Sequence, residues 1–321
     1  MTTILLGLQP EKVSSEHLGR IRALAPEAAV VVTKDRAEME ALLHEVEIAA
    51  GSVPYDLIVR APALRWFQQW WAGADWLSDF PEAVRRPFVL TNASGVHAVP
   101  MSEHVLALML GFSRGMSLSY GAQARREWAQ EGQLRRVFEL AGKTALVVGL
   151  GAVGSRTAQV LQALDMVVWG VRRTGGSDVG SATRVVGTSA WRELLPEADF
   201  VVLTLPHTNM TRHLVAEQEL RRMKPTAYLI NVGRGACVDE VALVQALREG
   251  WIAGAGLDVF ETEPLPADSP LWDMRNVIVT AHYGGATPHG HERAMDIFLD
   301  NLRHYLEGEP LQNVVDKVAG Y

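Results

Sequence analysis

Three segments near the carboxyl end of this 321-residue chain carry side chains suited to acid–base chemistry. Arg234 lies in NVGRG, Glu263 in GLDVFETEPLP and His282 in VIVTAHYGG, each beside an apolar, strand-like run. When hydride adds to a carbonyl carbon, negative charge develops on the oxygen, and a positioned acid must supply a proton. His282 is suited to supply it, Glu263 would favour the imidazolium and fix its orientation, and Arg234 offers a permanent cation to a carboxylate. This set predicts reduction of a 2-keto acid.

A glycine motif earlier in the chain indicates where the hydride donor would bind. TALVVGLGAVGS places Gly149, Gly151 and Gly154 in G-x-G-x-x-G spacing, after an apolar strand and at the start of a helix. Gly149 permits the tight turn, Gly151 lets the backbone approach a pyrophosphate, and Gly154 allows close packing of helix on strand. The amides of Ala152 and Val153 would face that anion at the helix N-terminus. In this context we predict a dinucleotide site; a glycine turn without a ligand is the alternative.

The next strand bears on the choice between NAD(H) and NADP(H). An Asp or Glu about 20 residues after the glycines would grip the ribose 2′-hydroxyl. The sequence there reads MVVWGVRRTGG, with Arg172, Arg173 and Thr174 in place of a carboxylate. Arginine suits a 2′-phosphate through charge-assisted contacts, so NADP(H) is predicted in preference to NAD(H). A pair of solvated surface arginines is the alternative.

Each acid–base residue also fits a simpler role when it is considered alone. Arg234 can be a surface loop residue, Glu263 a solvated turn carboxylate and Asp258 a cap. Their order after successive strands favours a shared site, because the carboxyl ends of strands in an open α/β sheet line the ligand crevice. Asp258 would then face the nicotinamide carboxamide or its ring environment. The glycines after His282, including Gly284, would leave room for a cofactor or substrate.

Composition limits the possible partners and the compartment. The chain is 48% hydrophobic and 21% charged, typical of a globular protein, and its net charge of −7 argues against nucleic acid or an anionic membrane as the main partner. One cysteine rules out an internal disulfide and fits a reducing compartment. The N-terminus lacks a basic region and a long apolar run, so we expect a cytoplasmic protein without a signal peptide. No metal is expected, because hydride transfer needs none.

Strand-like runs alternate with helical patterns in two blocks, which predicts parallel sheets in an open α/β architecture. In the first block, TILLGL, AAVVV, DLIVR and PFVLTN are expected strands, and AEMEALLHEVE and LRWFQQWWAG expected helices. A long helical pattern from Met101 to about Trp128 precedes six further strands. We expect two Rossmann-like domains, with the cofactor domain inserted into the substrate domain. The predicted bounds are residues 1–99 and 288–321 for the substrate (catalytic) domain and 100–287 for the dinucleotide-binding domain.

These motifs together resemble the D-isomer-specific 2-hydroxyacid dehydrogenases over nearly the whole chain. TNASGVHAVPMSEHVLALML resembles the family's crossover segment, VVGLGAVGS its phosphate loop and LTLPHTNMTRHL its segment over the cofactor. NVGRG, GLDVFETEPLP and TAHYGG resemble its arginine, aspartate–glutamate and histidine signatures. The chain has no acidic residue after the second cofactor strand, and in this it resembles the NADPH-preferring glyoxylate/hydroxypyruvate reductase branch of the family.

The resemblance implies specific roles. Arg234 would bind substrate, Glu263 would pair with the histidine and His282 would be the acid/base. The segment QWWAGADWL resembles the family's substrate loop, so the amides of Ala72 and Gly73 would hold the substrate carboxylate. The implied cofactor contacts, beyond the glycine loop and residues 172–174, are Leu205, Pro206, Thr211, Val232, Asp258, His282 and Gly284. The helical region after Met101 implies an arm around a twofold partner, and hence a homodimer.

The expected reaction is reduction of glyoxylate, hydroxypyruvate or a similar small 2-keto acid by NADPH to the D-2-hydroxy acid. Two alternatives remain open. One is an NAD-linked D-2-hydroxyacid dehydrogenase for a bulkier substrate, since Trp71 or Trp76 would shape the pocket in ways that spacing does not define. The other is a non-catalytic, dinucleotide-sensing binding protein, which would bind the cofactor without turnover.

Overall fold

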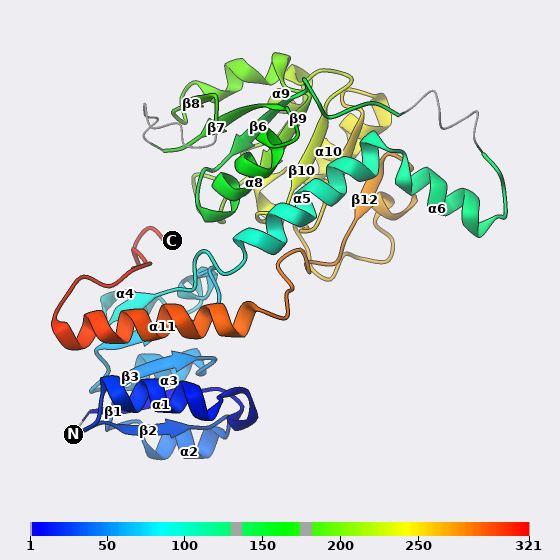
Figure 1. Cartoon of the computed structure of the whole chain (residues 1–321). Coiled ribbons are helices and arrows are strands. Elements are labelled where there is room, and N and C mark those ends of the chain that lie inside the picture. The colour runs from blue at the N-terminus through cyan, green and yellow to red at the C-terminus, as the bar shows by residue number, and fades with distance from the viewer. Residues whose placement is uncertain (1, 130–136, 174–181, 321) are drawn as a thin grey trace. The chain divides into compact units, whose positions relative to one another are not determined.

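The protein consists of two compact α/β units (Figure 1). Unit 1 comprises Met1–Val96 and Pro288–Tyr321, and unit 2 comprises His97–Thr287. The computed structural model describes residues 2–129, 137–173 and 182–320. All strand pairs in both sheets are parallel, and helices flank the sheets, which confirms the predicted fold class.

Unit 1 is built on a five-stranded sheet in the order β2-β1-β3-β4-β5. Its strands are β1 (Thr3–Gly7), β2 (Ala29–Val32), β3 (Val46–Gly51), β4 (Trp66–Gln68) and β5 (Val89–Thr91). Its helices are η1 (Pro10–Lys12), α1 (Ser15–Leu24), α2 (Arg36–Ala41), α3 (Tyr55–Arg60), η2 (Asp75–Ser78), α4 (Pro81–Arg85) and α11 (Gly290–Glu307). The amphipathic helix α11 packs on this sheet, where the rings of Phe298 and Tyr305 each lie 5.5 Å from that of Trp66.

Two predicted elements of unit 1 were of the wrong type, and AEMEALLHEVE, expected as one helix, holds the end of α2 and the first two residues of β3. DLIVR, expected as a strand, belongs to α3, which begins after Pro54 and buries Leu57 and Ile58. LRWFQQWWAG, expected as a helix, contains β4, whose three residues are all buried. Short apolar runs fit a buried strand and a buried helix segment equally well, so periodicity alone does not separate them.

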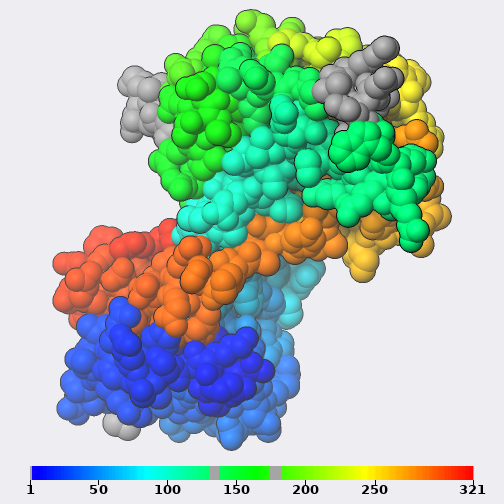
Figure 2. Space-filling model, turned by 45° about the vertical axis from the view of Figure 1, so that its right-hand side comes forward, coloured from blue at the N-terminus to red at the C-terminus, as the bar shows by residue number. Residues whose placement is uncertain are grey.

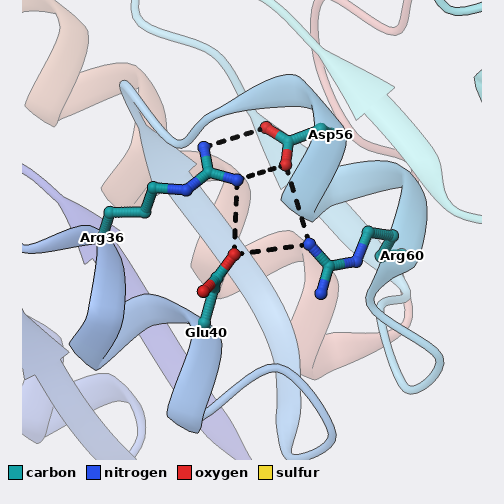
Figure 3. A network of polar contacts seen from close by, with 4 residues as sticks. All are labelled: Arg36, Glu40, Asp56 and Arg60. Carbon is teal, nitrogen blue, oxygen red and sulfur yellow. Dashed lines mark hydrogen bonds and ion pairs between the residues drawn. The ribbon is translucent and has the colours of Figure 1, made fainter.

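The surface of unit 1 carries an ion-pair network that joins α2 to α3 (Figure 3). The Arg36 guanidinium donates to both oxygens of Asp56 and to Glu40, and Arg60 lies 3.4 Å from Glu40 and 3.7 Å from Asp56. Hydrogen bonds from Arg36 hold the pKa of the Asp56 carboxyl below its usual value. Exposed pairs of this kind add little stability, so the network chiefly fixes how the two helices meet.

Unit 2 is built on a seven-stranded sheet in the order β12-β11-β10-β9-β6-β7-β8. Its strands are β6 (Thr144–Val148), β7 (Val167–Val171), β8 (Arg184–Val186), β9 (Phe200–Leu203), β10 (Tyr228–Asn231), β11 (Gly254–Leu257) and β12 (Val277–Val279). Its helices are α5 (Ala98–Ser113), α6 (Met116–Ala124), α8 (Ala152–Gln162), η3 (Trp191–Glu197), α9 (Glu217–Arg222), η4 (Gly235–Cys237), α10 (Glu240–Glu249) and η5 (Pro270–Asp273). The central strands β9 and β11 are buried along their whole length, as expected for a parallel sheet covered on both faces.

The long helical pattern predicted from Met101 to Trp128 is two helices. α5 ends at Ser113, and α6 begins after Gly115, whose φ of +62° is the left-handed conformation that glycine adopts without strain. Helix α5 packs against α8 of the same unit, which places it on one face of the sheet (Figure 1).

Candidate active site

Unit 2 has a topological switch point between β6 and β9. The chain runs from β6 to β7 and β8 on one side and from β9 to β10, β11 and β12 on the other. Ligands of open α/β sheets bind at the carboxyl ends of the strands beside such a point. The glycine loop follows β6, and the loops that carry Arg234, Asp258 and His282 follow β10, β11 and β12 at the same edge.

The glycine loop has the shape that a dinucleotide requires. Gly149 has a φ of +109°, and a Cβ at Gly154 would lie 1.9 Å from the carbonyl oxygen of Gly149. A Cβ at Gly151 would meet no protein atom within 4 Å, so this part of the backbone is open to a ligand. Helix α8 begins at Ala152, with Val153 in its first turn, and its N-terminal amides suit a phosphate.

Thr204, which the sequence reasoning missed, holds this loop in place. Its hydroxyl donates to the carbonyl oxygen of Gly149 at 2.6 Å, and it follows β9 directly. A threonine after an apolar strand gives no sequence signal of this contact, because the partner lies 55 residues away.

The arginine pair follows β7, next to the glycine loop. The Arg172 amide donates to Val186 of β8, and its side chain is half-buried. Its Nε is buried and makes no hydrogen bond among the described residues. Arg173 is exposed, and Thr174 lies outside the described residues. A buried guanidinium nitrogen without an acceptor fits a site for an additional anion.

The loop after β9 folds on itself beside the glycine loop. Thr211 donates its hydroxyl to the carbonyl oxygen of Pro206 at 2.7 Å and accepts the Thr208 amide at 2.8 Å. Leu205 packs against Gly149, and its backbone lies so close to Gly233 that a Cβ there would come within 2.6 Å of it. Val232, which directly follows β10, is buried, so its side chain serves the core.

His282 and Glu263 form a direct pair. The distance from Nδ1 of His282 to Oε2 of Glu263 is 2.6 Å, and the second glutamate oxygen accepts the Phe260 amide at 3.0 Å. The side chains are 50% and 35% exposed, so the imidazole is held on one side and open on the other. His282 has a φ of +51°, a conformation that a β-carbon disfavours.

The buried Asp258 holds the loop that carries His282. Its carboxylate accepts the Thr280 hydroxyl at 2.6 Å and the amides of Tyr283 and Gly284 at 3.2 and 2.9 Å. Its carbonyl oxygen accepts the His282 amide at 2.9 Å. His104 of α5 bonds to Thr280 at 2.9 Å and lies 3.5 Å from Asp258.

Packing within the protein also requires the glycines after His282. A Cβ at Gly284 would lie 2.8 Å from Oδ2 of Asp258 and 2.9 Å from the His104 ring, and a Cβ at Gly285 would lie 3.2 Å from His97. They therefore make room for side chains of the protein itself. The expected room for a ligand beside them stays a prediction.

Arg234 lies in a loop whose backbone is fixed. The Asn231 side chain donates to the carbonyl oxygen of Arg234 at 3.0 Å and accepts the Gly233 amide at 3.1 Å. A Cβ at Gly235 would lie 1.9 Å from the Phe260 backbone, so the Arg234 loop and the Glu263 loop touch directly. The structure thus brings Arg234, Glu263 and His282 onto contacting loops of one unit.

In unit 1, the loop after β4 presents two backbone amides. Gln69 donates to the carbonyl oxygens of Trp71 and Gly73 at 3.0 and 2.6 Å, and Asn92 donates to that of Ala72 at 2.8 Å. The amides of Ala72 and Gly73 donate to no acceptor in the described part of unit 1. Trp76 is buried and Trp71 bonds to Tyr55, so both belong to the packing that shapes this loop.

A glycine loop at a switch point, with an acid–base pair on the same edge, defines a dinucleotide-dependent oxidoreductase. The chain belongs to the D-isomer specific 2-hydroxyacid dehydrogenase family, because residues 106–284 match that family's NAD binding domain. It is 35% identical over 300 residues to a glyoxylate reductase of Thermococcus litoralis, which covers 91% of this chain and 88% of the relative.

Solved structures with the same fold include two cofactor complexes. An NADPH-dependent glyoxylate/hydroxypyruvate reductase from Sinorhizobium meliloti, in complex with NADP and sulfate, matches with a TM-score of 0.82 and 28% identity, over 100% of this chain and 99% of that one. A D-isomer specific 2-hydroxyacid dehydrogenase from Xanthobacter autotrophicus, in complex with NADPH and MES, matches with a TM-score of 0.82 and 30% identity, over 99% of both chains. Among the described residues, the structure contains no helix long and apolar enough to cross a membrane.

Proposed function

We propose that this protein reduces a small 2-keto acid, with glyoxylate and hydroxypyruvate as the first candidates, to its D-2-hydroxy acid by using NADPH. The observation that carries the proposal is the 2.6 Å pair of His282 and Glu263 on a loop that touches the Arg234 loop. A carboxylate against Nδ1 fixes the ring and stabilises its protonated form, which leaves Nε2 to deliver a proton.

The residues of unit 2 fit a bound dinucleotide. Gly149, Gly151 and Gly154, with the amides of Ala152 and Val153, would hold the pyrophosphate. The further contacts would come from the adjoining loops, at Leu205, Pro206, Thr211 and Gly284, and from the backbone of Val232. Oδ2 of Asp258 has one hydrogen bond among the described residues, from Gly284, and would accept the nicotinamide carboxamide. The cofactor, when bound, supplies the hydride.

The substrate would be held by its carboxylate and its carbonyl. Arg234 supplies a permanent positive charge to the substrate. As charge develops on the carbonyl oxygen, His282 gives it the proton, and Glu263 stabilises the ring in the charged state that precedes this step.

The preference for NADPH rests on Arg172 and Arg173. The buried Nε–H of Arg172, which has no acceptor among the described residues, would donate to a 2′-phosphate. Replacing both arginines with glutamine should weaken NADPH binding at least tenfold and leave NADH binding within about twofold. Equal losses for both cofactors would refute the 2′-phosphate assignment and favour an NAD-linked enzyme.

A homodimer is part of the proposal. Tyr120 of α6 is 62% exposed and Trp128 is 91% exposed, and the α5–α6 segment lies on the surface of unit 2 (Figure 2). Large exposed aromatic side chains are typical of interfaces. Light scattering coupled to size exclusion should give twice the mass of the 35.2 kDa chain.

The decisive experiment measures loss of the reduced-nicotinamide absorbance with NADPH and with NADH over glyoxylate, hydroxypyruvate, pyruvate and phenylpyruvate. We expect faster oxidation of NADPH with the small acids, and loss of most turnover in His282→Ala with cofactor binding retained. Preference for phenylpyruvate with NADH would favour the dehydrogenase for bulkier substrates. Cofactor binding without turnover of any acid would favour a dinucleotide-sensing protein.

A further inference from the structure

His213 lies in the loop between β9 and α9, and its imidazole has no part in the mechanism above. The residue has a φ of +47°, in the left-handed region that favours glycine, and its side chain is 35% exposed. Non-glycine residues persist in this conformation where the surrounding contacts fix them. The contacts of His213 therefore offset the cost of its positive φ.

The backbone of His213 is bonded to the loop that follows Arg234. The His213 amide donates to the carbonyl oxygen of Ala236 at 2.8 Å, and the Val215 amide donates to that of Cys237 at 3.0 Å. These bonds join the loop after β9 to η4. They depend on the main chain alone, so any residue other than proline at position 213 can make them.

The side chain of His213 is bonded instead to the loop that carries Glu263. Its Nε2 forms a hydrogen bond with Oε1 of Glu261, two residues before Glu263. The Glu261 amide donates to Oε2 of Glu240, the first residue of α10, at 3.3 Å. Residues 258–266 contain no helix or strand, so contacts of this kind must hold the loop.

A second carboxylate, that of Glu240, lies near Glu261. Burial raises the pKa of Glu240 and the Glu261 carboxylate adds to this rise, while the hydrogen bond from the Glu261 amide opposes it. His213 supplies the hydrogen-bond donor that keeps the Glu261 side chain in place despite the repulsion between the two carboxylates. Without it, the Glu261 side chain would lose this hydrogen bond. The segment from Phe260 to Glu263 would keep the buried Phe260 side chain, the contact with Gly235, the amide bond to Glu240 and the bonds of Glu263 itself.

We propose that His213 is a positioning residue that, through Glu261, holds the Glu263 carboxylate against His282. The inference rests on the proposed function for its kinetic consequence, but the alignment itself is a property of unit 2. Because the main-chain bonds to the Arg234 loop survive removal of the imidazole, substrate binding by Arg234 should be spared. Proton delivery by His282 should be impaired, since that step depends on Glu263.

His213→Gly is the informative variant, because glycine adopts a positive φ without strain and the backbone bonds are kept. We expect kcat to fall about tenfold, with KM for the keto acid and the melting temperature nearly unchanged. His213→Gln should restore most of kcat, because its amide nitrogen lies about as far from the backbone as the imidazole Nε2. Glu217→Gln is the matched control: it removes the exposed ion pair with Arg221 in α9, 2.7 Å long, and should leave kcat unchanged.

A double-mutant cycle adds a second test. If His213 acts through Glu261, then Glu261→Gln should lower kcat by a similar factor, and the double variant should be no worse than either single one. Additive losses would overturn the proposed route. A fall in melting temperature together with a rise in KM would mean a merely structural role and would also overturn it.

A readout without turnover separates this inference from the proposed function. With ¹⁵N-histidine labelling, the low-field proton of the His282–Glu263 hydrogen bond should be visible in the wild type and lost or shifted in His213→Gly. If the wild type reduces no acid but the signal changes as expected, the proposed function fails and the positioning role stands. If the wild type is active and His213→Gly retains both the signal and kcat, the positioning role alone is refuted.

Discussion

Replacing Glu263 with glutamine tests the acid–base pair most directly. The two oxygens of Glu263 take two N–H donors, the Phe260 amide at 3.0 Å and Nδ1 of His282 at 2.6 Å. Glutamine has one oxygen and one NH₂ group, so it can accept only one of the two donors. If its oxygen keeps the Phe260 amide, its NH₂ group faces Nδ1, and the imidazole can no longer carry both protons.

The size of the effect follows from these contacts. General acid catalysis contributes about 10²–10⁴-fold to the rate, and we expect Glu263→Gln to lose about 10²–10³-fold in kcat, or roughly 3–4 kcal/mol of transition-state stabilisation. Stability should change far less, because the side chains of the pair are 35% and 50% exposed. Exposed pairs contribute about 0–1 kcal/mol, which corresponds to a shift of at most a few degrees in melting temperature.

The assay is steady-state oxidation of reduced nicotinamide from about pH 5.5 to 8.5, with cofactor affinity measured by fluorescence. A kcat within threefold of wild type at every pH, with cofactor affinity and melting temperature intact, would refute the assignment of Glu263 as the partner of the acid. Loss of cofactor affinity in parallel with kcat would instead mean that the variant had disturbed the dinucleotide site.

Three further predictions concern stability and cofactor binding. Burial opposes ionisation of Asp199, but a backbone amide and Lys224 at 2.9 Å hold its pKa below the ordinary value. Asp199→Asn should therefore lower the free energy of unfolding in urea by about 1 kcal/mol at pH 7. The difference between variant and wild type should close as the pH falls below about 4. Burial lowers the pKa of His291, which accepts from Trp70 at 3.2 Å, so the unfolded state binds the proton at a higher pH than the folded state does. The free energy of unfolding of the wild type should therefore fall below about pH 6.5. It should fall less in His291→Asn, which keeps an acceptor for Trp70. In Gly154→Ala, the added Cβ must displace a backbone carbonyl 1.9 Å away, and calorimetry should show cofactor affinity reduced by at least about tenfold.

The sheet of unit 2 was largely predictable, and the reason is burial. Six of its strands are nearly continuous apolar runs, the pattern of a parallel sheet covered on both faces. The exception is β8 (Arg184–Val186), a short edge strand with little apolar signal. In unit 1, α3 and β4 were interchanged because each is a short apolar run whose type is decided by its neighbours in space.

The residues of the candidate site likewise fall into those that the sequence predicts and those that it does not. Residues carried by motifs after strands, such as Arg234 and His282, were predictable because strand order places their loops at one edge. The residues that hold those loops were not, because their partners are distant in sequence: 48 residues separate His213 from Glu261, and 176 separate His104 from Thr280. No local pattern of residue types encodes such a pair.

Asp258 shows how these supports bear on the chemistry. A buried carboxylate is costly unless donors surround it, and here a hydroxyl and two amides do so, with His104 nearby. Those same bonds fix Tyr283 and Gly284, and the Asp258 carbonyl fixes the His282 amide, so the strained φ of +51° at His282 is determined by the aspartate. Without these bonds, the half-exposed loop would not hold the His282 ring in one orientation. Asp258 directly follows β11, so it ties the backbone of His282 to the sheet, while the His282 ring stays half-exposed and accessible to substrate.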